Sequence, residues 1–388
     1  MQVDVVDYGA RPDGRTLNTS SIQKAIDACH QAGGGRVFCG AGTYIIGSLL
    51  LKSNVELHLS AGCKLLGSTS LAVYADFDAP GFHKENAPEN STKSLIRAIG
   101  AENVAITGPG EINANGLAFF NTSEMQWEIF FKKPATERPR SFMADNCRRV
   151  RLEDVSLIDS PSWTVWLLKC EDVRVHRITI SADQRMINND GIDFDACRNV
   201  IVSDSRFKTA DDCIVLRSIQ QMFDEPAACE NVTVTNCILD SWCQGVRIGC
   251  PSDYVIRNAT FSNLVIHSRN NGILFEYPVG YLVCGNTGSM DVRNILFDNV
   301  TIDCQRHPVK INVQEGVSNV RVEGIHFSNF RIKSGFPCQI SGNPKSIIRD
   351  VTFTDIDLET SGDDAILCRH CAGIKLNNVS LSNRAAPQ

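Results

Sequence analysis

The sequence predicts an all-β solenoid in which short strands coil into a parallel β-helix. Three observations lead to this prediction: strands rich in Val and Ile at short intervals, one dipeptide that recurs along the chain, and a helical segment placed to cap one end. Such strands, separated by turn residues, are typical of all-β proteins. Repeat periods of about 20 to 50 residues are typical of solenoids.

The recurring dipeptide is Asn-Val or a close variant, and each copy opens a short apolar strand. The copies begin at Asn54, Asn103, Arg149, Asp172, Asn199, Asn231, Asn258, Asn294, Asn319 and Asp350. Their spacing varies, for example 27 residues from position 172 to 199 and 36 from 258 to 294. We therefore expect coils of constant size that are joined by loops of different length.

Residues 18–31 are predicted to form a helix that covers the first coil. Polar residues open this segment, Gln23 stands three positions after Ser20 as in a capping box, and the glycines at 33–35 end it. A solenoid needs such a cap, because its terminal coil would otherwise expose an apolar interior.

The whole chain, residues 1–388, is predicted to form one β-helix domain. It contains no linker, low-complexity tract or shift in composition. A β-sandwich or barrel is the alternative all-β fold. The regular return of the opening dipeptide and the scarcity of Asn-Gly hairpin signals favour the solenoid.

Composition excludes several classes of function. The chain has 38 basic and 44 acidic residues and no basic run, so no nucleic-acid partner is expected. No stretch of about 18 apolar residues predicts a membrane span, and no pattern predicts a metal or organic cofactor. The 16 cysteines are expected to be reduced core thiols, since many lie in apolar runs. These thiols, and a beginning without signal-peptide features, favour a cytoplasmic location unless a leader has been removed.

Two short segments supply clustered carboxylates. Residues 188–193 read NNDGID and residues 209–213 read TADDC, so Asp190 and Asp211 are 21 residues apart, about one coil. Coils stacked about 4.8 Å apart would gather Asp190, Asp211 and Asp212 on one surface. Glycoside hydrolysis needs a protonated carboxyl for the leaving oxygen and an ionised one that activates water or attacks carbon. Crowded like charges should keep one carboxyl protonated at neutral pH. The structural alternative is a set of turn residues that bind backbone amides.

From residue 7 to about residue 375 the chain resembles the polygalacturonase-like glycoside hydrolases of family 28. The matching segments are DYGA at 7–10, DG at 13–14, TSSIQKAI at 19–26, GGRV at 34–37, GPGEI at 108–112, RPR at 138–140, DSPSW at 159–163, NNDGID at 188–193 and TADDC at 209–213. Their order and spacing together are specific for the fold. The resemblance implies a right-handed parallel β-helix that acts on pectin-type oligosaccharides without a cofactor.

The resemblance also implies roles for the three aspartates. Asp211 would be the general acid, and Asp190 and Asp212 would hold and deprotonate the attacking water, with inversion at the anomeric carbon. A separation near one coil spacing would instead favour retention by the general rule for paired carboxyls. We follow the family and expect inversion.

Three positions depart from the family pattern. The family's Gly-His-Gly corresponds to residues 243–245, where Gln244 replaces the histidine. Its Arg-Ile-Lys, which grips the substrate carboxylate, corresponds to residues 274–276, where Leu274 and Glu276 replace the two cations. Because a glutamate repels a uronate, plain galacturonan need not be the substrate. Residues 331–333 spell Arg-Ile-Lys but come about two coils too late.

Other residues are candidates for contact with an oligosaccharide. Arg247 is expected to bind a substrate oxygen anion, and one of Trp163 and Trp166 is expected to stack on a sugar, since residues three apart in a strand face opposite sides. The remaining substrate-binding candidates are Gln244, Glu276, Asn188, Asn271, Arg140 and Lys310. Their alternatives are core packing or solvated ion pairs.

The sequence therefore predicts a glycoside hydrolase that trims imported oligosaccharides from chain ends. One alternative is a carbohydrate-binding β-helix that has lost activity. Another is a β-helix lyase or epimerase, which would need a base beside C5 and a group that neutralises the carboxylate. No prediction of oligomeric state follows from the sequence.

Overall fold

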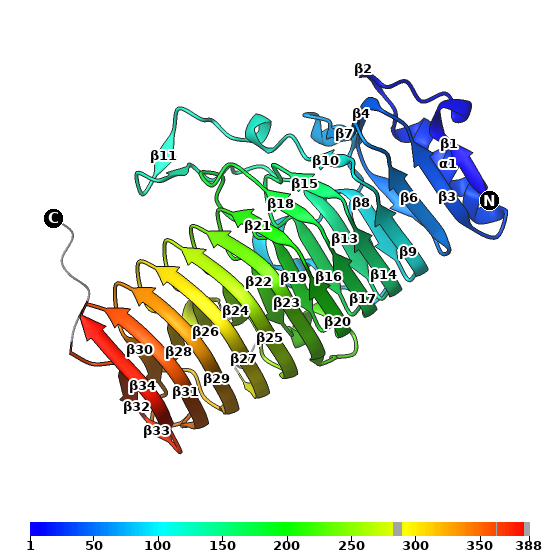
Figure 1. Cartoon of the computed structure of the whole chain (residues 1–388). Helices are drawn as coiled ribbons and strands as arrows, with labels where there is room; N and C mark the ends of the chain where they lie inside the picture. Colours follow the sequence, from blue (N-terminus) through cyan, green and yellow to red (C-terminus); the bar gives the residue numbers. More distant parts are fainter. Residues whose placement is uncertain (282–288, 362, 384–388) are drawn as a thin grey trace.

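The computed structural model describes residues 1–281, 289–361 and 363–383, and it confirms the predicted right-handed parallel β-helix (Figure 1). An 11-stranded parallel sheet forms one side of the coil. Its strands are β5 (Leu49–Leu51), β8 (Ser94–Ile99), β13 (Arg140–Asp145), β16 (Val165–Leu168), β19 (Ile192–Asp195), β22 (Ile214–Arg217), β24 (Val246–Gly249), β26 (Ile273–Tyr277), β28 (Val309–Val313), β30 (Cys338–Ser341) and β32 (Ile366–Arg369).

A 21-stranded sheet closes the rest of each coil. Its strands are β1 (Gln2–Asp4), β2 (Asp13–Leu17), β3 (Gly35–Cys39), β4 (Gly42–Ile46), β6 (Val55–Leu59), β7 (Cys63–Gly67), β9 (Glu102–Thr107), β10 (Glu111–Asn113), β14 (Arg148–Glu153), β15 (Ser156–Ile158), β17 (Glu171–His176), β18 (Thr179–Ser181), β20 (Arg198–Ser203), β21 (Arg206–Thr209), β23 (Cys229–Ser241), β25 (Val255–Ser268), β27 (Met290–Cys304), β29 (Val320–Ser334), β31 (Ile348–Thr360), β33 (Cys371–Ala372) and β34 (Lys375–Asn383). Short 3₁₀ helices lie at Val5–Tyr8, Leu71–Val73, Lys84–Asn86, Pro88–Asn90, Gly116–Phe119, Gln220–Met222 and Val279–Tyr281.

The residue that opens each repeated strand makes the bend between coil faces. All ten predicted opening positions have left-handed backbone, with φ of 64° at Asn54 and 52° at Asp350. Asparagine tolerates this conformation because its side chain forms local hydrogen bonds. Along the stack these side chains bond one another, as Asn231 does to Asn199 at 3.1 Å and Asn258 does to Asn231 at 3.3 Å. The Asn-Val repeat is thus the sequence signature of a recurring corner.

The interior is a single column of apolar side chains that alternate with outward-facing residues along each strand. Phe261, Phe297, Phe327 and Phe353 stack at the same position of successive coils, with ring centroids 4.6, 5.4 and 4.9 Å apart. Parallel strands repeat in register at every coil, so equal positions meet equal positions. This alternation leaves the outer face of the 11-stranded sheet free to carry polar groups.

Helix α1 (Thr19–Gln31) covers the first coil, as predicted (Figure 1). The predicted capping box is wrong. Asn18 is the N-cap residue and makes no side-chain cap bond. Gln23 instead bonds both backbone groups of Leu50, at 2.8 and 3.1 Å, because the helix packs across β5.

Chain excursions cover part of the outer face of the 11-stranded sheet. Phe77, Trp166, Met222 and their neighbours form a second apolar cluster between the 71–92 segment, the 219–227 segment and the sheet. On another side of the coil, the small hairpin of β11 (Met125–Gln126) and β12 (Phe130–Phe131) projects from the stack (Figure 1).

Cys304 apart, the cysteines that the structure describes are free thiols, and 11 of these 14 are buried. Cys284 lies outside the described residues. Across the described ranges, no helix has the length and hydropathy of a membrane span.

Candidate active site

The three predicted aspartates lie at the corner that precedes the 11-stranded sheet. Asp190 and Asp212 each stand two residues before paired positions of β19 and β22. The amide of Gly191 donates to the carbonyl of Asp212 at 2.8 Å, and the amide of Asp211 donates to that of Asn189 at 3.3 Å. A side chain at Gly191 would collide with the next coil. One coil is 22 residues here, so Asp190 and Asp212 occupy equal positions of neighbouring coils, and the structure brings the three carboxyls together.

A cavity of ≈ 300 Å³ opens at this corner. Its wall comes from the sheet and from three excursions. The lining residues are Pro88, Glu89, Trp163, Asn188, Asp190, Asp211, Arg217, Arg247, Cys250, Pro251 and Gly280. Its volume is at the low end of the range for small-molecule pockets, about 300–1,000 Å³.

Burial and mutual repulsion favour protonated carboxyls in this cavity. Burial, followed by the charges of Asp211, Asp193 and Asp212, raises the pKa of Asp190 well above its usual range. Burial and then the charge of Asp212 raise the pKa of Asp211 to about 6, against the opposing effects of Arg247 and of a hydrogen bond from a neighbouring thiol. Interacting carboxyls of this kind titrate as a group.

Asp212, Arg247 and Glu276 form a chain of ion pairs across three coils. The guanidinium of Arg247 donates to Asp212 at 3.0 Å and to Glu276 at 3.1 Å. Asp212 is fully buried, while Glu276 keeps 21% of its side chain exposed. Arg247 thus lines the cavity with both ends of its guanidinium already paired.

Arg217, which is not among the residues predicted from the sequence, forms a second buried ion pair. It donates to Asp193 at 2.7 Å and to the carbonyl of Cys250 at 3.1 Å, and it lies 3.8 Å from Asp190. Its guanidinium stacks 4.0 Å from the ring of Trp163. The alternation of β22 is the signal that could have found it, because its position faces outward beside the aspartates.

The prediction that Trp163 and Trp166 face opposite sides is wrong. Trp163 precedes β16 rather than lying in it, and the two rings meet edge to face with centroids 5.4 Å apart. Trp163 reaches the cavity, and Trp166 is buried with its indole donating to Asp195. Arg140 is fully buried, with its guanidinium 4.5 Å from the ring of Trp163. Arg140 and Arg217 both lie over the ring of Trp163, so little of the face of this ring is open to a sugar.

Arg138 and Glu89 extend the wall beyond the predicted residues. Arg138 is buried and donates to Glu89 at 3.1 Å, to Asn188 at 3.2 Å and to the carbonyls of Pro161 and Ile187. Glu89 belongs to a non-repeating excursion, and no sequence pattern distinguishes it. Asn188, a predicted binding residue, lines the cavity with its oxygen engaged by Arg138.

Gln244 and Asn271 bond each other beside the cavity. The oxygen of Gln244 accepts from the amide nitrogen of the Asn271 side chain at 3.1 Å and from its backbone at 3.2 Å. The nitrogen of Gln244 donates to the sulfur of Cys243 at 2.8 Å. The thiol of Cys243 in turn bonds the carboxyl of Asp211. The side chains of Asn271, Gln244 and Cys243 thus form a chain of hydrogen bonds that ends at Asp211, the predicted general acid.

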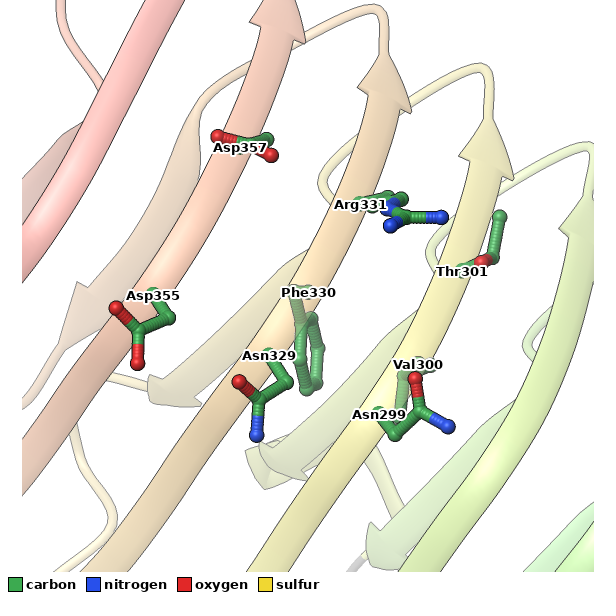
Figure 2. A pocket seen from close by; sticks show the side chains of 8 residues that line it. All are labelled: Asn299, Val300, Thr301, Asn329, Phe330, Arg331, Asp355 and Asp357. Atoms are coloured by element: carbon green, nitrogen blue, oxygen red, sulfur yellow. The ribbon is translucent and has the colours of Figure 1, made fainter.

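Lys310 lies apart from the cavity lining. In the sheet register it pairs with Leu274, which pairs with Arg247, so Lys310 is two coils away. Arg331 is farther still, since it belongs to β29 of the other sheet. There it lines a shallow depression of ≈ 380 Å³ beside Asp357, on the outer surface shown in Figure 2.

One group of side chains in the described residues could approach a metal ion. Ligand atoms of Asp211, Asp212 and Cys243 lie within 4.8 Å of one another. Burial and the nearby aspartates raise the pKa of the Cys243 thiol well above its usual range, and Arg247 already pairs with Asp212. A metal would have to displace a proton and compete with a cation, so this donor set fits acid–base chemistry better.

Comparison with protein families gives two matches. The model described as "Glycosyl hydrolases family 28" matches residues 53–223. The model described as "Rhamnogalacturonase A/epimerase, pectate lyase-like" matches residues 2–68. The first match contains the segments of all three aspartates.

Individual relatives agree with these families. A "Probable polygalacturonase" of Vitis vinifera is 30% identical over 222 residues, which cover 55% of this chain and 44% of the grape protein. A "Probable exopolygalacturonase B" of Aspergillus terreus is 26% identical over 376 residues, covering 88% and 80%. The chain thus spans less than half of the first relative and four fifths of the second.

Among solved structures, the hyperthermoactive exopolygalacturonase of Thermotoga maritima superposes with a TM-score of 0.74 at 21% identity. The match covers 98% of this chain and 91% of that one. At this identity the likeness bears on the fold alone.

Proposed function

The chain is a divergent member of glycosyl hydrolase family 28, the polygalacturonase-like glycoside hydrolases, and from this premise we propose its reaction. It hydrolyses glycosidic bonds of pectin-type oligosaccharides at the chain end, with inversion at the anomeric carbon. The observation that carries the proposal is the meeting of Asp190 and Asp211, from consecutive coils, in one small cavity beside a buried Asp212.

Asp211 is the general acid in this proposal. It is partly exposed, lines the cavity, and has a pKa raised to about 6, so it can carry a proton to the leaving oxygen. Asp212 is held by Arg247 as an ion pair and serves as the anion that orients the attacking water. Asp190 lines the same cavity and, in its ionised form, receives the proton that the attacking water loses.

Action at the chain end is supported by the shape of the cavity. Pro88 and Glu89 come from one excursion, Pro251 from a second and Gly280 from a third, and all four stand around the carboxyls. A walled cavity of ≈ 300 Å³ suits one terminal sugar better than the middle of a polymer. Asn188 lines this wall, whereas Gln244, Asn271 and Arg140 support it from behind.

The test compares wild-type protein with the Asp211→Asn variant on a panel of pectin-type oligosaccharides, both uronic and neutral. Products are followed by mass spectrometry. We expect wild type to release single terminal sugars that have gained one water, and the variant to lose at least 1,000-fold in rate. Early proton NMR of the released sugar should show the inverted anomer.

Other outcomes of this test identify the alternatives. A product lighter by one water would indicate a lyase. Binding of oligosaccharides without turnover, equal in both proteins, would indicate a carbohydrate-binding protein.

We also propose that the enzyme works in a reducing compartment such as the cytoplasm. Buried free thiols of the described coils, such as those of Cys170, Cys197 and Cys213, support this, because oxidising compartments favour paired cysteines. Thiol titration of the unfolded protein, purified under non-reducing conditions, should find all 16 cysteines reduced. Disulfides found there would overturn this location.

A further inference from the structure

Both cations that line the cavity, among the residues the structure describes, already have carboxyl partners. Arg217 pairs with Asp193 at 2.7 Å and faces Asp190 at 3.8 Å. Arg247 pairs with Asp212 at 3.0 Å and with Glu276 at 3.1 Å. Four carboxyl groups therefore surround two guanidinium groups.

The rest of the polar lining is acidic or neutral. Glu89 and Asp211 add carboxyls to the wall, and Asn188 adds an amide. Arg138, just behind this wall, is occupied by Glu89 at 3.1 Å. A sugar that carried its own carboxylate would face a lining rich in carboxyl groups and would find no unpaired cation in the described lining.

The apolar lining offers a different basis for recognition. Pro88, Pro251 and Trp163 contribute carbon surface to the cavity. A neutral pyranose combines apolar C–H faces with hydroxyls that hydrogen-bond to carboxylates without a charge penalty. The lining is thus matched to an uncharged sugar.

We propose that Glu276 is a specificity-determining residue, which holds Arg247 in an ion pair and so restricts the cavity to a neutral terminal sugar rather than a uronate. This inference rests on the proposed hydrolase function and names its substrate class. Glu276 suits the role because it is the less buried partner of Arg247 and adjoins the cavity without supplying a carboxyl to the reaction. Removing the charge of Glu276 would free one side of the Arg247 guanidinium.

The experiment uses two oligosaccharides with the same linkage. One ends in galacturonate, and the other is its carboxyl-reduced counterpart, which ends in galactose. We expect wild type to cleave the neutral-ended substrate with kcat/KM at least 10-fold above that for the uronate-ended one. Glu276→Gln, which preserves shape and removes charge, should shrink this preference at least 10-fold.

Glu230→Gln is the matched control. Glu230 also keeps 21% of its side chain exposed and also pairs with an arginine, Arg257 at 2.7 Å, but it lies on the other sheet. This control should keep the wild-type preference. A wild-type preference for the uronate end, or an unchanged preference in Glu276→Gln, would overturn the inference.

A binding measurement distinguishes failure of this inference from failure of the proposed function. Calorimetry of the Asp211→Asn protein should detect galactose more readily than galacturonate, and adding Glu276→Gln should reverse or erase that order. Adding Arg247→Gln as well should remove the gained galacturonate binding. If wild type hydrolyses neither substrate but this order of binding holds, the hydrolase function fails and the neutral-sugar preference stands. If hydrolysis occurs but galacturonate binds better from the start, only the inference fails.

Discussion

Replacing Arg217 by methionine should destabilise the protein in a manner that depends on pH. The side chain is 3% exposed, and its nearest contact is Asp193 at 2.7 Å, itself fully buried. Methionine retains most of the apolar volume but leaves the carboxylate without a counter-charge. Removing one partner of a buried ion pair costs about 3–5 kcal/mol.

The pH dependence follows from the protonation of Asp193. Burial raises its pKa to about 7, and Arg217 works against that rise. The folded protein therefore binds this proton more tightly than the unfolded chain, and stability falls as pH rises from about 4 towards 7. Without Arg217 the folded pKa is higher still, so the loss continues above pH 7. The variant should lose about 3–5 kcal/mol at pH 8 and clearly less at pH 5, where Asp193 is protonated in both proteins.

Urea unfolding followed by tryptophan fluorescence at pH 5 and pH 8 measures this difference. The double variant Arg217→Met with Asp193→Asn should recover part of the loss at pH 8, because no buried charge remains. The control is Arg257→Met, whose exposed ion pair should contribute less than about 1 kcal/mol at either pH. A loss for Arg217→Met that is equal at both pH values would refute the electrostatic argument and assign the effect to packing.

Three further outcomes are expected. Because the pKa of Asp211 is about 6, kcat/KM should fall about tenfold per pH unit above roughly pH 6; a flat profile to pH 8 contradicts its role as the acid. The thiol of Cys243 lowers the pKa of Asp211 by hydrogen bonding. Cys243→Ala should therefore move the fall in kcat/KM to higher pH, and Cys243→Ser should keep it near the wild-type pH. The same pH dependence in all three proteins would contradict this hydrogen bond. Phe297→Ala, which opens the centre of the aromatic stack, should cost about 3–5 kcal/mol in urea unfolding; the half-exposed Phe336→Ala serves as control and should cost far less.

The coil itself could be predicted from the sequence, because its cause is local and repeats. Among residues that have a side chain, asparagine is one of the few that tolerate left-handed backbone. The corner therefore selects asparagine at a recurring position, as at Asn199 and Asn231. Parallel pairing then fixes which residues meet between coils. For the same reason one coil of spacing was enough to bring Asp190 and Asp212 together.

The surroundings of those aspartates were decided only by the tertiary structure. Glu89 reaches the cavity on an excursion with no period, and nothing in its neighbours marks it. Gln244 and Asn271 were predicted to meet substrate, yet each finds its hydrogen-bond partner in the other.

Ion pairing with neighbouring carboxylates determines whether Arg247 is available to a substrate. The sequence places it on the correct face, but its availability depends on two carboxylates from neighbouring coils that bind it first. Register along a β-helix follows from the chain, because backbone hydrogen bonds repeat at every coil. The conformation of a side chain on its outer face depends on neighbours about one coil spacing away and on loops that fold back over it, and no sequence period records those contacts.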